Sequence, residues 1–557
     1  MNTIRPFAFV SILVGVLVLS ACSKSADPAS APVATAAPVT AAAQNARSDA
    51  GIAWQRAGTD AEVDAAFAAA RTQSKPVFVY WGAKWCPPCN QLQATLFNRQ
   101  DFIERTRAFV PVYVDGDSPG AQKIGARFRV SGYPTMVLFN PQGEEVTRLP
   151  GEVDPVRYTQ VMTLGMNAAR PVKAVLADAL AGTGSLGVND WRLLAFYSWD
   201  TDHQQIVAKD RLPDTLAALA AACPADQLEA ATRLRLKALV AAQTKGAAAG
   251  GKTPVAAPVA SDAILAVLAD PARSREQTDT LTNYAAEVVR ASSAAKTPQR
   301  QALLAAFDQA LKRLQADATL SRADRMQALI AQVDLARIDE AREPAGAAAR
   351  PATAPRLDAA LLADVRAHVA RADTEITDSY ERQAVITAGA YLLEHAGLGA
   401  ESDTLLKANL AKSHSPYYLM SALAGNAKKR GDKAEALQWY GQAFEKSEGP
   451  ATRLQWGSSY VAALVDLAPT DEATIERTTA QLFDEAGKQS DAFHERSGRS
   501  LARIGSKLQA WNKGGTHTAV MERLQSRLDA VCAAPGLGAT ERAACNGLLR
   551  ASQKSSA

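Results

Sequence analysis

The most constraining feature of the sequence is a strand-to-helix junction that carries two cysteines. Residues 76–81, Pro-Val-Phe-Val-Tyr-Trp, form a short β-branched and aromatic run with the length of a buried strand. A Cys-Pro-Pro-Cys motif follows, and residues 90–96 then have the spacing of a helix whose first turn contains proline, where proline is tolerated. Cys86 is therefore expected at a helix N-terminus, where unpaired amide groups and the helix dipole stabilise a thiolate. Cys89, one turn later, is placed to attack a mixed disulfide.

The segment around this junction resembles a known family. Residues 109–114 predict a second strand, and Gly-Tyr-Pro-Thr at 132–135 leads into a third at 136–139. Together with Trp85, which directly precedes the first cysteine, these features make residues 55–168 similar to the thioredoxin superfamily. That family shares a Trp-Cys-x-x-Cys at the start of a helix and a Gly-x-Pro-Thr before an antiparallel strand. The resemblance covers roughly one fifth of the chain.

The resemblance implies an α/β thioredoxin-like domain over residues 53–170 with a redox-active dithiol. It assigns the reaction to Cys86 and Cys89 and a supporting role to five neighbours: Trp85, Pro87, Pro88, Tyr133 and Pro134. Pro134 would be a cis proline beside the cysteines, and the backbone of Tyr133 would pair with an extended client segment. Half of a zinc site and a structural disulfide are the alternatives, but no second cysteine or histidine pair lies nearby to complete four zinc ligands. We expect no metal and no cofactor.

The two residues between the cysteines indicate the direction of the reaction. Groups that stabilise the Cys86 thiolate favour the reduced protein and make it an oxidant. Pro87 and Pro88 lack a backbone N–H, and neither supplies the positive charge that a histidine supplies in strongly oxidising relatives. We therefore predict a disulfide reductase, with a potential nearer the roughly −270 mV of thioredoxin than the roughly −120 mV of a strong oxidant.

The sequence departs from cytosolic thioredoxins at the buried acid that assists the resolving cysteine. That position is Tyr80, which titrates far above neutral pH and cannot readily accept the proton of Cys89. The departure resembles periplasmic and membrane-linked relatives that couple to a dedicated electron donor. Asp115 and Asp117 follow the next strand, and we expect them to form a solvated turn. Lys84 is expected to be exposed.

The N-terminus predicts export and a lipid anchor. One arginine precedes an uncharged apolar run at residues 7–19, which is too short for a confident membrane span but typical of a signal peptide. The run ends in Leu-Ser-Ala-Cys, which resembles the lipobox of bacterial lipoproteins, so residues 1–21 would be removed and Cys22 lipidated. A generic signal peptide with a coincidental cysteine is the alternative. Ser23, rather than an aspartate, favours the outer over the inner membrane, and residues 22–52 are Ala/Pro-rich and suit a tether.

The other three cysteines divide into a pair and a single residue. Cys532 and Cys545 flank a Pro-Gly turn between two helical stretches, which in an oxidising compartment predicts a structural disulfide. Cys223 ends an apolar run, where a cysteine is more often an inert buried residue than a reactive thiol.

The chain after residue 171 is predicted to be all helical. Strand signals stop there, and alanine is abundant while aromatic residues make up only 6 % of the chain, a composition that favours helices. The stretches expected to be helical are 191–199, 227–240, 278–289, 301–314 and 323–341. Residues 423–443 match the small and aromatic spacing of a single tetratricopeptide repeat. We predict an α-solenoid-like array that binds protein, although ordinary helix packing explains the same residues.

Two Ala/Pro-rich stretches, 245–260 and 343–356, are expected to be linkers between helical subdomains at 171–244, 261–342 and 357–557.

Two further patterns in the helical part are rejected as sites. Residues 246–253 satisfy the phosphate-loop formula, but they follow a helical stretch rather than a strand and run into Pro254. The six histidines lie between residues 203 and 517 without metal-ligand spacing, and His494 with Glu495 is expected on an exposed helix face.

Two functions remain open from the sequence. The favoured one is a periplasm-facing, lipid-anchored disulfide reductase whose partners are client proteins with disulfides, a membrane electron-donor protein and the membrane itself. The other is a protein-binding helical array in which the thioredoxin-like segment serves recognition or structure. Nucleic-acid binding has no support, because the excess of 61 basic over 57 acidic residues is only +4 and is not gathered into a basic block.

Overall fold

The computed structural model describes residues 51–550, apart from residues 131, 152–153, 200–201, 203–204, 249–257 and 341–356. The predicted signal peptide, Cys22 and the tether up to residue 50 lie outside the described residues. So do the linker 343–356 and most of the linker 245–260.

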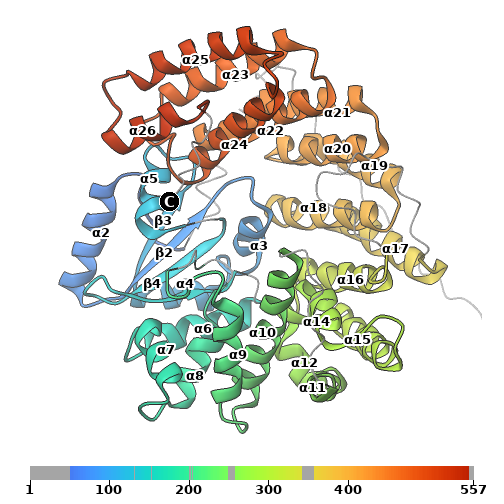
Figure 1. Cartoon of the computed structure of the whole chain (residues 1–557). Coiled ribbons are helices and arrows are strands. Elements are labelled where there is room, and N and C mark those ends of the chain that lie inside the picture. The colour runs from blue at the N-terminus through green and yellow to red at the C-terminus, as the bar shows by residue number, and fades with distance from the viewer. Residues whose placement is uncertain are drawn as a thin grey trace, which may run out of the picture. The chain divides into compact units, whose positions relative to one another are not determined.

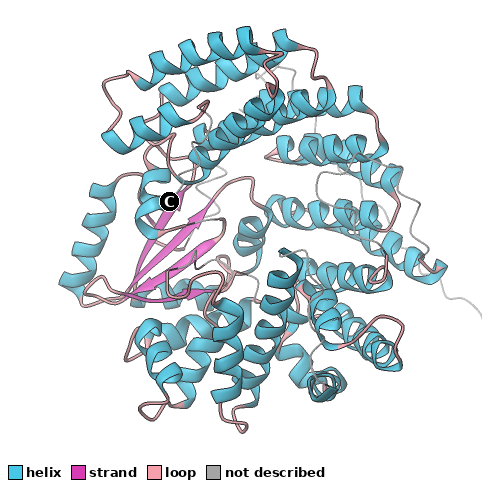
Figure 2. Cartoon of the chain, in the orientation of Figure 1, coloured by secondary structure: helices cyan, strands magenta, loops and turns pink. Residues whose placement is uncertain are grey.

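A five-stranded mixed sheet forms the N-terminal part of the described chain (Figure 2). Its strands are β1 (Gln55–Arg56), β2 (Val77–Gly82), β3 (Val110–Asp115), β4 (Thr135–Phe139) and β5 (Glu145–Leu149). The spatial order is β1-β3-β2-β4-β5, in which β3 pairs in parallel with β1 and β2, while β4 pairs antiparallel with β2 and β5. The central strand β2 thus lies between a parallel and an antiparallel neighbour.

Helices cover both faces of this sheet, which explains why every residue of β2 is buried. On one face, Val79 and its alternate neighbours pack with α2 (Asp60–Gln73) and α5 (Ala121–Phe128). On the other, Phe78 and Tyr80 pack with α3 (Pro87–Thr95), α4 (Gln100–Arg105) and α6 (Pro155–Met166), and η1 (Thr106–Ala108) precedes β3. The strand period of two therefore sorts successive side chains into two cores.

All strands of the described residues end by Leu149, and the remainder is helical (Figure 1). The helices are α7 (Val172–Ala181), α8 (Val188–Ala195), α9 (Leu212–Ala222), α10 (Leu228–Ala248), α11 (Pro258–Ala269), α12 (Pro271–Glu276), α13 (Thr278–Asn283), α14 (Ala285–Ser292), α15 (Pro298–Ala316), α16 (Arg322–Ala336), α17 (Ala359–Glu375), α18 (Ser379–His395), α19 (Gly399–Asn409), η2 (Leu410–Lys412), α20 (Pro416–Arg430), α21 (Lys433–Lys446), α22 (Pro450–Leu467), α23 (Glu472–Gly487), α24 (Glu495–Trp511), α25 (Thr518–Cys532) and α26 (Ala539–Gly547). The predicted fold class, an α/β domain followed by a large helical region, is confirmed. The solenoid-like repeat stays a prediction.

The cores follow the chain in order. Leu194 of α8 and Leu234 of α10 belong to the same buried cluster as Phe78 of β2, so α7–α10 pack directly on the α/β domain. Further clusters join α10 to α16, α16 to α20, and α21 to α26. Helices therefore pack mainly against their neighbours in sequence.

Two predictions about the helical part are wrong in detail. The stretch 278–289 is divided into α13 and α14 at Tyr284, whose backbone (φ −130°, ψ 22°) is not helical. His494 does not lie on an exposed helix face, because it precedes α24 and its Nε2 lies 3.0 Å from Oε1 of Glu541, which belongs to α26. The two side chains are 17 % and 16 % exposed, so the pair is half-buried.

No helix among the described residues is long and apolar enough to cross a membrane. Within the same part of the chain, no group of three or more His, Cys, Asp or Glu side chains is placed to hold a metal ion.

Candidate active site

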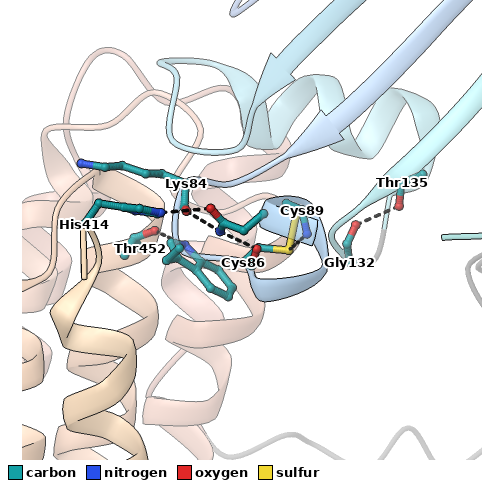
Figure 3. Close-up of a disulfide and its surroundings, with 9 residues drawn as sticks. Lys84, Cys86, Cys89, Gly132, Thr135, His414 and Thr452 are labelled. Carbon is teal, nitrogen blue, oxygen red and sulfur yellow. Dashed lines mark hydrogen bonds between the residues drawn. A yellow bond between two sulfur atoms is a disulfide. The ribbon is translucent and has the colours of Figure 1, made fainter. Parts of the chain in front are cut away.

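The two cysteines of the Cys-Pro-Pro-Cys motif form a disulfide at the junction between β2 and α3 (Figure 3). Cys86 is the N-cap residue of α3, and its Sγ accepts a hydrogen bond from the backbone N–H of Cys89 at 3.3 Å. Pro87 and Pro88 occupy the first turn and contribute no N–H there. The helix N-terminus therefore offers this sulfur a backbone donor from Cys89 but none from the two residues between the cysteines.

The segment before β4 lies beside the disulfide. The Tyr133–Pro134 peptide bond is cis, and Thr135, which follows it, pairs with Trp81 of β2. The hydroxyl of Thr135 donates to the carbonyl of Gly132 at 2.8 Å. Figure 3 shows this turn next to the two cysteines.

Asn90, a buried polar residue of α3, fixes the backbone around Cys86. Its amide Nδ2 donates to the carbonyl oxygens of Cys86 (2.8 Å) and Lys84 (2.9 Å). Its Oδ1 lies 3.0 Å from Nε2 of His414, which precedes α20. Burial lowers the pKa of His414 to about 4, with a smaller contribution from the charge of Lys84, so the imidazole is neutral at pH 7. Nε2 must then carry the proton, because Oδ1 of Asn90 can only accept.

The indole of Trp85 is held by a chain of hydrogen bonds that reaches Asp117. Its Nε1–H donates to Oγ1 of Thr452 at 2.7 Å, and that hydroxyl donates to Oδ2 of Asp117 at 2.6 Å. The backbone N–H of Thr452 donates to Oδ1 of the same carboxylate at 2.7 Å. Thr452 lies in the first turn of α22, so the helical region supplies the partner of the motif tryptophan.

The expectation of a solvated turn at the end of β3 is wrong. Burial beneath α22 raises the pKa of Asp117 to about 6, and the charge of Asp115 raises it further while the bonds from Thr452 lower it. Burial also raises the pKa of Asp115, whose Oδ1 accepts the backbone N–H of Asp117 at 3.0 Å. The sequence could not reveal this, because the residues that bury the turn lie more than 300 positions away.

Helices from the C-terminal half cover the disulfide. Cys86 is 2 % exposed and Cys89 is 3 % exposed, and both belong to a buried cluster with Tyr417 and Met420 of α20, Ala443 of α21 and Trp456 of α22. The ring of Trp85 stacks on Tyr418 (centroids 5.9 Å apart) and meets Trp456 edge to face (4.9 Å). Only Pro88 of the motif is exposed.

The side chain of Arg496, in α24, also packs on the residues around the disulfide. The guanidinium of Arg496 lies over the ring of Trp85, 4.9 Å from its centroid, and over the ring of Tyr133, 4.3 Å from its centroid. Its backbone N–H donates to Oε1 of Gln122 at 3.0 Å, and Oδ2 of Asp491 accepts the backbone N–H of Gln122 at 2.9 Å. The sequence patterns singled out neither Arg496 nor its partners Gln122 and Asp491.

Lys84 and Tyr80 differ in their surroundings. Lys84 is partly exposed, as expected, and its Nζ forms an ion pair with Oε2 of Glu448 at 3.1 Å. Tyr80 is buried in the core between the sheet and α3, where its ring stacks on Tyr113 (5.3 Å) and meets Phe97 edge to face (4.9 Å). Its place is that of a core aromatic residue.

The remaining cysteines lie far from this site in sequence. Cys532 at the end of α25 and Cys545 in α26 form a second disulfide, with Cα atoms 5.7 Å apart, inside the C-terminal core. Cys223 is a buried free thiol, and burial raises its pKa to about 11. A thiol with so high a pKa carries little thiolate at neutral pH and is inert.

Comparison with known proteins places this site in a family. Residues 63–164 match the family described as a thioredoxin-like domain. The thiol:disulfide interchange proteins DsbD 1 and DsbD 2 of Pseudomonas aeruginosa are 33 % identical over 110 residues and 30 % identical over 98 residues. The first alignment covers 18 % of this chain and 18 % of the relative, and the second covers 17 % of each. The chain therefore matches less than one fifth of the length of these relatives.

Among solved structures, a thioredoxin from Thermus thermophilus is 28 % identical, and the match covers 21 % of this chain and 90 % of that chain with a TM-score of 0.18. The two cysteines and the Tyr133–Pro134 turn lie within residues 63–164, the segment that matches the family. Residues 63–164 of this chain are a thioredoxin-like domain of the thioredoxin superfamily.

Proposed function

We propose that this protein is a thiol:disulfide oxidoreductase, and that it reduces disulfides of exported proteins. The observation that carries the proposal is the Cys86–Cys89 pair at the N-terminus of α3, beside the 132–135 turn (Figure 3), in a domain similar to thiol:disulfide interchange proteins. A pair that forms a disulfide at one helix terminus is the arrangement that two-electron exchange requires.

The reaction uses one sulfur as nucleophile and the other to resolve it. In the reduced protein the Cys86 thiolate attacks one sulfur of a client disulfide, forming a mixed disulfide and releasing the first client thiolate, which takes up a proton. The Cys89 thiolate then attacks Sγ of Cys86, so that the second client thiolate leaves and is protonated. The client gains two electrons and two protons, and the Cys86–Cys89 disulfide forms. A membrane electron-donor protein with its own dithiol returns the pair to the reduced state.

The reducing direction is supported by the first turn of α3. Pro87 and Pro88 withhold two backbone donors from the Cys86 thiolate, and only the N–H of Cys89 is within hydrogen-bond distance, at 3.3 Å. A less stabilised thiolate makes the disulfide the favoured form, and the dithiol is then a better reductant.

We place the protein in the bacterial cell envelope, anchored by lipid at Cys22 and facing the periplasm, with the outer membrane favoured over the inner. The lipobox-like sequence ending at residue 22 supports this location. Cys22→Ala should move the protein from the membrane fraction to the soluble fraction, because it removes the thiol that would carry the lipid. A variant that still sediments with membranes would show that another segment or a protein contact holds the chain.

The activity is tested with single cysteine variants of the full chain. The reduced wild type should cleave a model disulfide, Cys86→Ser should abolish cleavage, and Cys89→Ser should accumulate mixed disulfides because the first attack survives. Cys223→Ser is the matched control and should behave as wild type, because its thiol lies outside the site. Mass mapping of complexes trapped by Cys89→Ser in cells would identify the clients.

A second function is favoured by one observation, the burial of both cysteines under α20–α22. In that case the helical array binds protein and the thioredoxin-like domain serves recognition or structure. The same variants distinguish the two functions. If the protein only binds other proteins, the reduced wild type should cleave no disulfide substrate, and Cys86→Ser should still pull down the same partners.

A further inference from the structure

The face of the thioredoxin-like domain that carries the dithiol is occupied by the protein's own helices. Disulfide exchange requires the attacked sulfur of the partner to reach Sγ of Cys86, yet this residue is 2 % exposed. Cys89 is 3 % exposed, so the described part of the chain leaves neither sulfur a surface on which a partner disulfide could sit. Next to this contact, the cavity lined by Tyr133 and Arg496 has a volume of about 10 Å³, which is room for a single water molecule.

The contact between helices and domain is built from matched polar groups as well as apolar ones. Thr452 satisfies the indole N–H of Trp85 and both carboxylate oxygens of Asp117. Buried polar atoms that lose such partners cost free energy, so this contact favours one arrangement over many loose ones. At the rim of the contact, Lys84 pairs with Glu448 in partly exposed surroundings.

The contact also engages the features that flank a thioredoxin-like dithiol. α20 and α22 pack on Trp85 and on both cysteines, while Arg496 of α24 lies over Tyr133, the residue before Pro134. Because the helices take up both sides of the dithiol, a partner cannot use either side while they are in place.

We propose that α20–α22, together with Arg496 of α24, form an intramolecular cover that closes the dithiol against its disulfide partners, and that exchange proceeds only from an opened form. This inference rests on the proposed function and concerns the regulation of the same site. The reaction rate is then the intrinsic rate multiplied by the fraction of molecules in the opened form. A client or electron donor lowers this barrier only if it binds the opened form more tightly than the closed one.

The cover is tested on the reduced full-length protein with iodoacetamide, by mass mapping of the alkylated Cys86 peptide over time. In the wild type, Cys86 should react at least about tenfold more slowly than the same thiol in a short peptide of identical sequence, because only the open fraction reacts. Thr452→Val removes the hydroxyl that links Trp85 to Asp117, and it should accelerate the alkylation of Cys86 about tenfold, the effect of losing one buried hydrogen bond. Thr452→Ser keeps the hydroxyl and should stay close to the wild type.

Cys223 provides an internal control in the same sample. It is buried in the core shared by the sheet and α7–α10, so its alkylation rate reports general loosening of the fold. If the alkylation of Cys223 and that of Cys86 both accelerate in Thr452→Val, the whole fold has loosened. The ion pair between Lys84 and Glu448 then provides the test of the cover. Lys84→Glu and Glu448→Lys should each accelerate Cys86 roughly twofold, as expected of a partly exposed pair, and the double swap should restore protection.

Rapid alkylation of Cys86 in the folded wild type, at the rate of the peptide, would overturn the cover. The cover would also be overturned if neither Thr452→Val nor the charge swap changed the rate of Cys86 alkylation. The outcome is separate from that of the proposed function, because alkylation needs no disulfide substrate. Suppose that Cys86 is protected from alkylation, that Thr452→Val relieves this protection, and that neither protein reduces a disulfide. This result would refute the proposed oxidoreductase and leave the cover in place.

Discussion

Closure over the dithiol should depend on pH through Asp117. In the closed form its pKa is raised to about 6 by burial, whereas the ordinary value is 3.8. The groups that face it are Asp115, whose charge raises the pKa, and Thr452 and Arg496, which lower it. Opening exposes the carboxylate to water and returns the pKa toward 3.8. The closed form therefore binds the proton more tightly, and its advantage is greatest in acid and is lost as pH rises from about 4 to about 6.

The size of this effect follows from the two pKa values. The full difference corresponds to about 3 kcal/mol, at about 1.36 kcal/mol per pH unit. Between pH 7 and pH 5 only part of it is realised, and the open fraction should fall about tenfold. Asp117→Asn cannot ionise, so its open fraction should not change over this range.

The assay is the alkylation of Cys86 at pH 5 and pH 7, expressed as the rate of Asp117→Asn divided by that of the wild type at the same pH. The ratio cancels the loss of thiolate in acid, which affects both proteins alike. We expect the ratio to be about tenfold higher at pH 5 than at pH 7. A ratio that is the same at both pH values would refute the assignment of a raised pKa to a carboxylate that opening exposes.

Three further predictions concern stability and redox potential. Replacing Cys532 and Cys545 by serine should lower the free energy of unfolding of the C-terminal helices by about 3 kcal/mol, from the chain entropy of the closed loop, and urea denaturation of the oxidised and variant proteins measures it. An equal midpoint in both would show that the cross-link adds no stability. Arg233→Met should cost about 3–5 kcal/mol, because the side chains of Arg233 and Asp279 are 1 % and 5 % exposed and the carboxylate would lose both hydrogen bonds from the guanidinium. Adding Asp279→Leu should recover most of the loss. Pro88→His should raise the reduction potential, measured by equilibration with glutathione, because it adds a group that stabilises the Cys86 thiolate. A wild-type potential already near roughly −120 mV would contradict the role given to the prolines.

The thioredoxin-like part of the fold could be predicted because its signals are local. The run 76–81 has the length and composition of a strand, and prolines directly after Cys86 mark the first turn of a helix, so the strand-to-helix junction lies where the pattern places it. The helical remainder could also be predicted, because strand signals stop by about residue 171, although the last strand of the described chain already ends at Leu149. Such features depend on neighbours within about ten positions.

The cover could not be predicted, because no local pattern encodes it. Two acidic residues after a strand are typical of a surface turn, but here both are half-buried, and Asp117 accepts hydrogen bonds from Thr452, which is 335 positions away. The prediction that His494 lies on an exposed helix face was wrong for the same reason, because its partner Glu541 belongs to another helix. The break at Tyr284 has neither proline nor glycine to announce it. For Asp117 and His494, a tertiary contact decided what composition left open.

The 367 positions between Trp85 and Thr452 also set an order of events during synthesis. A chain is made from its N-terminus, and a domain folds once its own residues are available. The sheet is complete by Leu149, so the dithiol forms long before α22 exists. During this interval Cys86 and Cys89 have no cover, because α20–α22 have not yet been made. The helices of the C-terminal half therefore end the period in which the folded domain carries an uncovered dithiol.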